Sequence, residues 1–194
     1  MAENIRLFIA VNMAEDLRAA IAEAQQRLGA NRADVKWVRP EIIHITLKFL
    51  GWVEDGRVAE IGDAVARALT GAAAFRLRLE GIGSFPSPTA PRVVWVGVKE
   101  GAAELTDLAR RVEDALEPLG FEREARGFSP HVTIGRLKSP TGRGALVELM
   151  RAEQDRPFGE MEVARVELMR SDLRPSGPIY TSQREFLLGA GSAG

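Results

Sequence analysis

The 194-residue sequence contains no cysteine and only two histidines. The absence of cysteine excludes disulfide bonds, thiolate nucleophiles and sulfur-ligated metal sites. Two histidines cannot complete a zinc site without carboxylate ligands, and no His-Glu-x-x-His pattern is present. The sequence therefore predicts a protein that works without a metal ion or cofactor.

Neither sign of charge is in excess, since 26 basic and 27 acidic residues give a formal net charge of −1. A protein that coats long nucleic acid is usually strongly basic, so any contact with nucleic acid should be confined to an end or a single phosphate. No stretch approaches the roughly 20 apolar residues of a membrane span, and the N-terminus does not resemble a signal peptide. We expect a cytoplasmic protein with no membrane contact. We also expect a monomer, because no heptad pattern or long apolar helix face is present.

Apolar residues recur at the two spacings that mark regular secondary structure. Alternating or short, mainly apolar runs predict strands at residues 5–11, 36–38, 43–50, 75–79, 93–98, 131–135, 160–169 and 180–188. Apolar residues three and four apart predict helices at residues 14–28, 54–69, 102–119 and 145–151. Loops rich in Gly, Pro and Ser are expected at residues 81–91 and 175–178.

Strands outnumber helices in this pattern, and few connections resemble a regular βαβ series. The sequence therefore predicts an α+β fold rather than a doubly wound sheet. The chain is long enough for one core, so we expect a single domain over residues 1–188. Residues 189–194 contain only Gly, Ala and Ser and are predicted to be disordered.

Both histidines begin the same four-residue pattern, His44-Ile45-Thr46-Leu47 and His131-Val132-Thr133-Ile134. Only seven of the 194 residues are Thr, so a chance repetition that uses every histidine is improbable. By strand alternation, the histidine and threonine of each motif share the face that points away from the core. The motifs lie 87 residues apart, and each is followed by a loop, a helix and further strands. This arrangement favours two similar lobes.

Two such strands facing each other could surround a phosphate with two imidazoles and two hydroxyls. Hydroxyls can donate to the non-bridging oxygens, and histidine titrates close to neutral pH. One imidazole can then remove a proton from the attacking oxygen while the other protonates the leaving oxygen. The motifs therefore predict metal-independent displacement at phosphorus. Their spacing does not determine which histidine is the acid.

Three other residues are candidates for substrate contact. Alternation places Lys48 on the face of His44, where it could meet a phosphate, although an exposed strand lysine is common. Arg136 falls on the core side of its strand, and it reaches the phosphate only if that strand bulges or ends after Gly135. Phe128 precedes the second motif and could contact a base or pack in its loop. Similar loop candidates are Arg39, Phe85 and Arg126.

The sequence resembles the two-histidine phosphoesterases, specifically the bacterial and archaeal RNA 2′,3′-cyclic phosphodiesterases, which are also described as 2′-5′ RNA ligases. The resemblance covers nearly the whole chain. It is carried by residues 6–11, 37–41, 44–51, 83–86, 91–95, 128–136 and 177–180. Both histidine motifs match in full.

This resemblance implies a bilobal, pseudo-two-fold α+β fold, in which two antiparallel sheets line a central cleft and helices pack outside. It implies hydrolysis of a terminal RNA 2′,3′-cyclic phosphate, or of a small cyclic nucleotide, to a 2′-phosphomonoester. His44 would protonate the departing 3′ oxygen, and His131 would activate water. Thr46 and Thr133 would hold the phosphate. The assignment of acid and base comes from the resemblance alone.

Three other hypotheses remain open at this stage. The same groups could join RNA halves through a 2′-5′ bond, with a 5′-hydroxyl in place of water. The chain could instead bind RNA ends or nucleotides without catalysis, although the intact histidines and hydroxyls argue against this. The motifs could also be coincidental features of an α+β scaffold.

Overall fold

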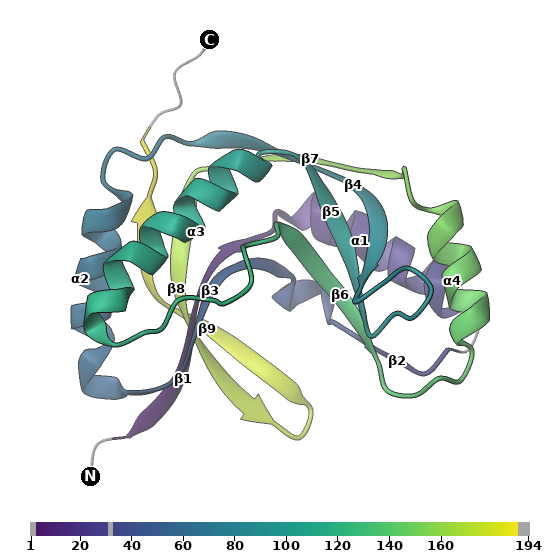
Figure 1. The fold of residues 1–194 in the computed structure, drawn as a ribbon, viewed down its shortest axis with the longest axis horizontal. Coiled ribbons are helices and arrows are strands. Elements are labelled where there is room, and N and C mark those ends of the chain that lie inside the picture. Colours follow the sequence, from purple (N-terminus) through teal and green to yellow (C-terminus); the bar gives the residue numbers. More distant parts are fainter. Residues whose placement is uncertain (1–2, 31–32, 190–194) are drawn as a thin grey trace.

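Residues 3–30 and 33–189 are described by a computed structural model, in which two antiparallel sheets stand side by side (Figure 1). The first sheet has the strand order β3 (His44–Glu54), β1 (Asn4–Asn12), β8 (Arg165–Arg174) and β9 (Gly177–Leu187). The second sheet has the order β2 (Val35–Trp37), β6 (His131–Leu137), β5 (Val93–Glu100), β4 (Phe75–Phe85) and β7 (Pro157–Val163). Each sheet thus contains one motif strand, β3 in the first and β6 in the second.

A pair of helices covers each sheet. Helices α2 (Val58–Leu69) and α3 (Ala102–Leu116) pack on each other, and they contact β9 and β3 of the first sheet. Helices α1 (Glu15–Gly29) and α4 (Arg143–Ala152) pack on each other, and they contact β7 and β4 of the second sheet. Figure 1 shows α2 and α3 on the left and α4 on the right. Within the described residues, no helix is long and apolar enough to cross a membrane.

Strand β1 is apolar on both faces, and both faces are buried. One face joins the main core, which includes residues of both sheets and all four helices; its β1 members are Ile5, Leu7, Ile9 and Val11. On the other face, Phe8 and Ala10 form a separate apolar cluster with Met169 and Tyr180. Cross-strand neighbours point to the same face of a sheet. This second cluster therefore lies on the face that carries His44.

The predicted α+β class is confirmed, with two antiparallel sheets and helices packed outside them. The cleft that the resemblance implies between the sheets stays a prediction. Two boundaries differ from expectation. The helix predicted at residues 54–69 starts at Val58, because β3 continues to Glu54 and a 3₁₀ turn (Asp55–Arg57) follows. The first half of the loop expected at residues 81–91 is strand, because β4 continues to Phe85.

The strand predicted at residues 160–169 is two strands. Strand β7 ends at Val163 and pairs with β4 in the second sheet, while β8 begins at Arg165 and pairs with β1 in the first. The chain therefore passes from one sheet to the other at Ala164. Periodicity did not reveal this break, since both halves have the composition of a strand.

Gly189 was expected to begin a disordered tail, but it belongs to the ordered fold. It forms a parallel bridge with Ala73, and its N–H donates to the carbonyl of Ala72 at 2.8 Å. The other residues of the expected tail, 190–194, lie outside the described part of the chain.

Candidate active site

The two histidines begin the two motif strands, which contact each other although they belong to different sheets. A short 3₁₀ turn (Pro40–Ile42) leads into His44, and Pro130 directly precedes His131. Proline fixes its own φ and disfavours helical conformation in the residue before it. The approach to each histidine is thereby restrained.

Both ring nitrogens of His44 have partners. Its Nδ1 lies 2.8 Å from the carbonyl oxygen of Ile42, and its Nε2 lies 3.0 Å from Oγ1 of Thr46. A carbonyl oxygen only accepts, so Nδ1 must carry a hydrogen. The neutral ring then has its acceptor lone pair at Nε2, and the imidazolium has a proton there to give. The exchangeable proton of His44 is therefore on the nitrogen beside the Thr46 hydroxyl.

His131 is held in the same way. Its Nδ1 donates to the carbonyl oxygen of Ser129, at 2.6 Å and again two residues earlier in the chain. Nε2 is consequently the nitrogen that gains or loses a proton in this histidine too. Thr133 lies on the same face of β6, opposite Trp95 of β5. The repeated sequence motif is therefore also a repeated geometry.

Burial lowers the pKa of both histidines. For His44, loss of hydration outweighs the hydrogen bond to Ile42, which acts in the opposite direction. For His131, loss of hydration again dominates, the bond to Ser129 opposes it, and the positive charge of Arg136 lowers the pKa further. Both imidazoles therefore favour the neutral form in the free protein. A bound anion would favour the charged form.

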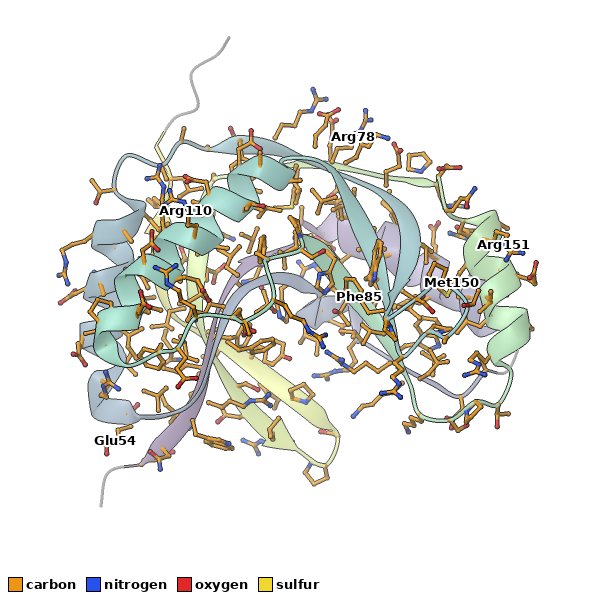
Figure 2. All side chains as sticks on the ribbon, in the orientation of Figure 1. Glu54, Arg78, Phe85, Arg110, Met150 and Arg151 are labelled. Carbon is orange, nitrogen blue, oxygen red and sulfur yellow. The ribbon has the colours of Figure 1, made fainter. Side chains whose placement is uncertain are left out.

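Aromatic rings pack against both imidazoles. The ring centroids of Phe8 and Tyr180 lie 4.9 and 5.4 Å from the ring centroid of His44. Phe85 packs edge-on against His131, with the ring centroids 5.0 Å apart. Figure 2 shows Phe85 near the middle of the molecule. Each imidazole thus has an aromatic wall from its own sheet.

Both motif strands bulge at the residue after the threonine. In β3, Thr46 is opposite Ala10 while Lys48 is opposite Ile9, so Leu47 is one residue in excess. A β-bulge of this kind reverses the alternation of the residues that follow it. At Lys48 and Phe49, β3 therefore presents the opposite residues to the histidine face, until a second bulge at Leu50 restores the original alternation before Trp52.

In β6, the excess residue is Ile134. Thr133 is opposite Trp95 and Gly135 is opposite Val94, which are consecutive residues of β5. The fourth position of each motif is therefore the bulged one. The two strands share this irregularity although their flanking sequences differ.

The bulge in β3 moves Lys48 away from the site, and the prediction that it shares the face of His44 is wrong. Lys48 is opposite Ile9 on the core face and is only 3% exposed. Its ammonium group lies 2.6 Å from a carboxylate oxygen of Glu113 in α3 and 2.8 Å from the carbonyl oxygen of Glu122. Lys48 is thus a buried link between the sheet and α3, and it is not available to a phosphate.

The bulge in β6 has the opposite effect on Arg136. Arg136 is opposite Val93, on the face of Thr133 and His131, which meets the condition under which we expected it to reach the phosphate. Its charge acts on His131 and also on Tyr180, the ring that packs against His44. One positive charge therefore acts on groups in both halves of the site.

Phe128 packs against the main core as a partly buried side chain. A substrate contact for it remains a prediction. Phe85, another loop candidate, is the ring against His131. Arg39 donates to the carbonyl of Pro178 at 2.7 Å and so joins the segment before β3 to β9.

Sequence reasoning gave no role to three aromatic residues of the site: Phe8, Trp95 and Tyr180. Tyr180 is the only tyrosine of the chain, and burial raises its pKa against the positive charges of Arg6, Arg136 and Arg39. A signal for Phe8 was present, since β1 is apolar at consecutive positions and therefore has two buried faces.

Within residues 3–30 and 33–189, no three His, Asp or Glu side chains are close enough to hold a metal ion.

Comparison with known proteins points to one family. Residues 13–175 match the model described as the 2′-5′ RNA ligase superfamily. The chain is 41% identical over 184 residues to a protein of Methanothermobacter thermautotrophicus named RNA 2′,3′-cyclic phosphodiesterase, with 95% of this chain and 99% of that protein covered. It is 40% identical over 182 residues to a protein of the same name from Archaeoglobus fulgidus, with 94% and 99% covered.

Solved structures share the fold. The protein TT0787 of Thermus thermophilus superposes with a TM-score of 0.80 at 32% identity, over 96% of this chain and 99% of that one. Escherichia coli LigT complexed with 3′-AMP superposes with a TM-score of 0.77 at 24% identity, over 96% and 99%. At this lower identity, the likeness concerns the fold alone.

Proposed function

Because the chain belongs to the 2′-5′ RNA ligase superfamily and has the activity of an RNA 2′,3′-cyclic phosphodiesterase, we propose that it works by two-histidine acid–base catalysis. In this mechanism, a 2′,3′-cyclic phosphate at an RNA end is hydrolysed to a 2′-phosphomonoester. The observation that carries this proposal is the equivalence of His44 and His131. Each has Nδ1 committed to a backbone carbonyl, which leaves Nε2 to exchange the proton.

The reaction begins with a water molecule in line with the bond from phosphorus to the 3′ oxygen. Nε2 of His131 takes a proton from this water as its oxygen attacks phosphorus. The bond to the 3′ oxygen breaks, and Nε2 of His44 protonates that oxygen. The products are a 2′-phosphomonoester and a 3′-hydroxyl. Exchange with solvent then returns the proton from His131 and reprotonates His44.

His44 must be protonated at the start of this cycle although its burial favours the neutral ring. The cyclic phosphodiester carries one negative charge, and an anion close to an imidazole raises its pKa. Substrate binding therefore supplies the charge that the acid needs. In the free protein, the same burial keeps His131 neutral and ready to act as a base.

The phosphate oxygens have donors from both sheets. Thr46 and Thr133 carry hydroxyls on the histidine faces, and Arg136 adds a guanidinium beside His131. Hydrogen bonds from charged donors are stronger than those from neutral ones. We infer that Arg136 balances the negative charge that develops on the phosphate while the two threonines orient it.

An RNA oligonucleotide that ends in a 2′,3′-cyclic phosphate tests the proposal. The wild type should release a terminal phosphomonoester on the 2′ oxygen, which phosphatase treatment and chromatography can identify. His44→Ala and His131→Ala should each be slower by about 10²–10⁴-fold. If both variants kept the wild-type rate, the two-histidine mechanism would be excluded. EDTA should leave the rate unchanged.

Ligation is the second candidate, because it would use the same acid and base with a different nucleophile and gives the superfamily its description. A 5′-hydroxyl of RNA would replace water and attack the cyclic phosphate to form a 2′-5′ bond. Incubation with excess 5′-hydroxyl RNA distinguishes the two reactions, since a joined product resistant to a 3′-5′-specific ribonuclease appears only with ligation. Tight binding of the cyclic end without any product would instead indicate a binding module.

A further inference from the structure

Two aromatic side chains extend from the catalytic face along β3. Phe49 is 53% exposed and Trp52 is 65% exposed, whereas aromatic residues of this size are usually well buried. Phe49 is opposite Phe8, and Trp52 is opposite Arg6. Phe8 lies on the histidine face, and Arg6 is two residues from it on the same strand. Phe49 and Trp52 therefore follow Thr46 on that face.

The three side chains are evenly spaced. Their partners on β1 are Ala10, Phe8 and Arg6, which are successive residues on one face of that strand. Alternate residues of a strand are about 7 Å apart. This distance is close to the separation of successive nucleotides in an extended single strand. A chain whose last phosphate lies at Thr46 could thus place its preceding bases at Phe49 and Trp52.

Arginines accompany the outer end of this row. A hollow of about 280 Å³ is lined by Trp52 together with Arg6, Arg174 and other residues. Within residues 3–30 and 33–189, neither Arg6 nor Arg174 forms an ion pair, while Arg170 in the same hollow is paired with Glu3 and Asp172. Two guanidinium groups are therefore free to meet phosphates beside an exposed indole.

We propose that Phe49 and Trp52 are stacking subsites for the nucleotides that precede the cyclic phosphate, with Arg6 and Arg174 close to the connecting phosphates. The inference rests on the proposed function, because it takes the phosphate position at Thr46 as its starting point. Aromatic rings beside basic groups are the usual platform for single-stranded nucleic acid. Continuity with the catalytic face and the adjacent arginines favour RNA over a protein as the occupant.

The row lies where an RNA chain could leave the site. Figure 2 labels Phe85, the ring against His131, near the middle of the molecule, and Glu54, the last residue of β3, at its lower left edge. Phe49 and Trp52 stand between Thr46 and Glu54 on this strand. The substrate would thus extend from the centre of the molecule along an edge strand of the first sheet.

Substrate length provides the test. We expect wild-type kcat/KM to be higher for a tetranucleotide ending in a 2′,3′-cyclic phosphate than for a nucleoside 2′,3′-cyclic phosphate. Trp52→Ala should lower the ratio of these two values by about fivefold to thirtyfold, chiefly through KM of the tetranucleotide. Trp52→Tyr should restore most of the ratio, because tyrosine also stacks. Phe49→Leu should lower it in the same direction.

Leu187→Ala is the matched control, since Leu187 is 78% exposed and apolar but lies on the opposite edge strand, β9. It should keep the wild-type ratio. A wild type without length preference, or a Trp52→Ala ratio equal to the wild-type ratio, would overturn the proposal. The proposal would also be overturned if the wild type sedimented as a dimer and Trp52→Ala as a monomer, because Phe49 and Trp52 would then form a contact between two copies of the chain.

A binding measurement separates this proposal from the proposed function. A tetranucleotide that ends in a 2′-phosphomonoester needs no turnover, and its binding should quench tryptophan fluorescence in the wild type more than in Trp52→Ala. If no cyclic phosphate were hydrolysed but this difference persisted, the catalytic proposal alone would fail. If hydrolysis proceeded and the quenching were equal, the stacking subsites alone would fail.

Discussion

At the residue scale, each imidazole is oriented by the carbonyl two residues before it. Ile42 holds His44, and Ser129 holds His131. The bond selects one tautomer, so that Nε2 faces the reaction in both cases. Opposite roles for the two rings must therefore come from their surroundings and from the position of the substrate. Arg136, which acts on His131, is one such difference.

Arg136→Gln tests this influence. The charge of Arg136 disfavours the imidazolium of His131, so its removal should raise the pKa of His131. It should also lower kcat/KM about tenfold to hundredfold, since a charged donor to the phosphate is lost. NMR titration is direct, because the chain has only two histidines and the spectrum of His44→Gln assigns both.

The control is the signal of His44, which should shift less than that of His131. An unchanged or lower pKa of His131 in Arg136→Gln would show that the guanidinium does not act on this ring.

Alternation predicted the faces of the motif residues but not those of Lys48 and Arg136. A bulge depends on how a strand pairs with its neighbour, β1 for β3 and β5 for β6. Local periodicity carries no information on that pairing. One signal was available, since Phe49 and Leu50 are consecutive apolar residues and break the alternation of the first motif strand.

At the scale of elements, Lys48 links β3 to α3 and to the loop before β6. Glu113 of α3 accepts from Lys48 and also from the backbone N–H of Glu124, and Glu122 accepts from Lys48 through its carbonyl. The strand of the first motif thereby holds the segment that leads to the second. A residue that looked like a ligand has a structural role.

Lys48→Met should lower the free energy of unfolding by about 3–5 kcal/mol, because it leaves the partly buried Glu113 carboxylate without its ammonium partner. Urea unfolding measures this loss. Lys99→Met is the control, since Lys99 pairs with Glu80 at 2.9 Å but is 55% exposed. It should cost less than about 1 kcal/mol. Equal losses in the two variants would contradict the account of Lys48.

Most elements follow from the pattern of apolar residues, and the failures have physical causes. The break at Ala164 lies within ten residues of uniform strand composition, and only the transfer from one sheet to the other separates β7 from β8. The late start of α2 has a similar origin. Pairing with β1 extends β3 to Glu54, which is the first residue of the predicted helix, and the 3₁₀ turn takes up the next three residues.

At the scale of the whole molecule, two sheets present the same motif, the same tautomer and the same bulge. The first residue on the histidine face after each bulge differs in chemistry: it is Phe49 in β3 and Arg136 in β6. The first sheet therefore offers a ring to a base, and the second offers a charge to a phosphate. The strand order that creates this arrangement was not accessible from periodicity, which gives the faces of strands but not their partners.

The partly buried histidines should make the stability of the molecule depend on pH. The pKa of His44 is lowered in the folded protein, so the unfolded chain binds its proton more readily. Stability is therefore fully present above the unfolded pKa of about 6.5 and is lost as the pH falls toward the folded value. Urea unfolding should show this loss, with a slope of at most about 1.4 kcal/mol per pH unit from His44. His44→Gln should have the smaller slope, and equal slopes would contradict this origin.

The central claim is that two histidines act on one phosphate, one as acid and one as base. The most direct test is kcat/KM for an RNA oligonucleotide with a 2′,3′-cyclic phosphate, measured from about pH 5 to pH 9 in the wild type, His44→Ala and His131→Ala. The account predicts a bell-shaped wild-type profile from two coupled groups, and a loss of about 10²–10⁴-fold in each variant. His131→Ala should lose the acidic limb and His44→Ala the alkaline limb. A variant that kept both limbs at the wild-type rate would contradict the account.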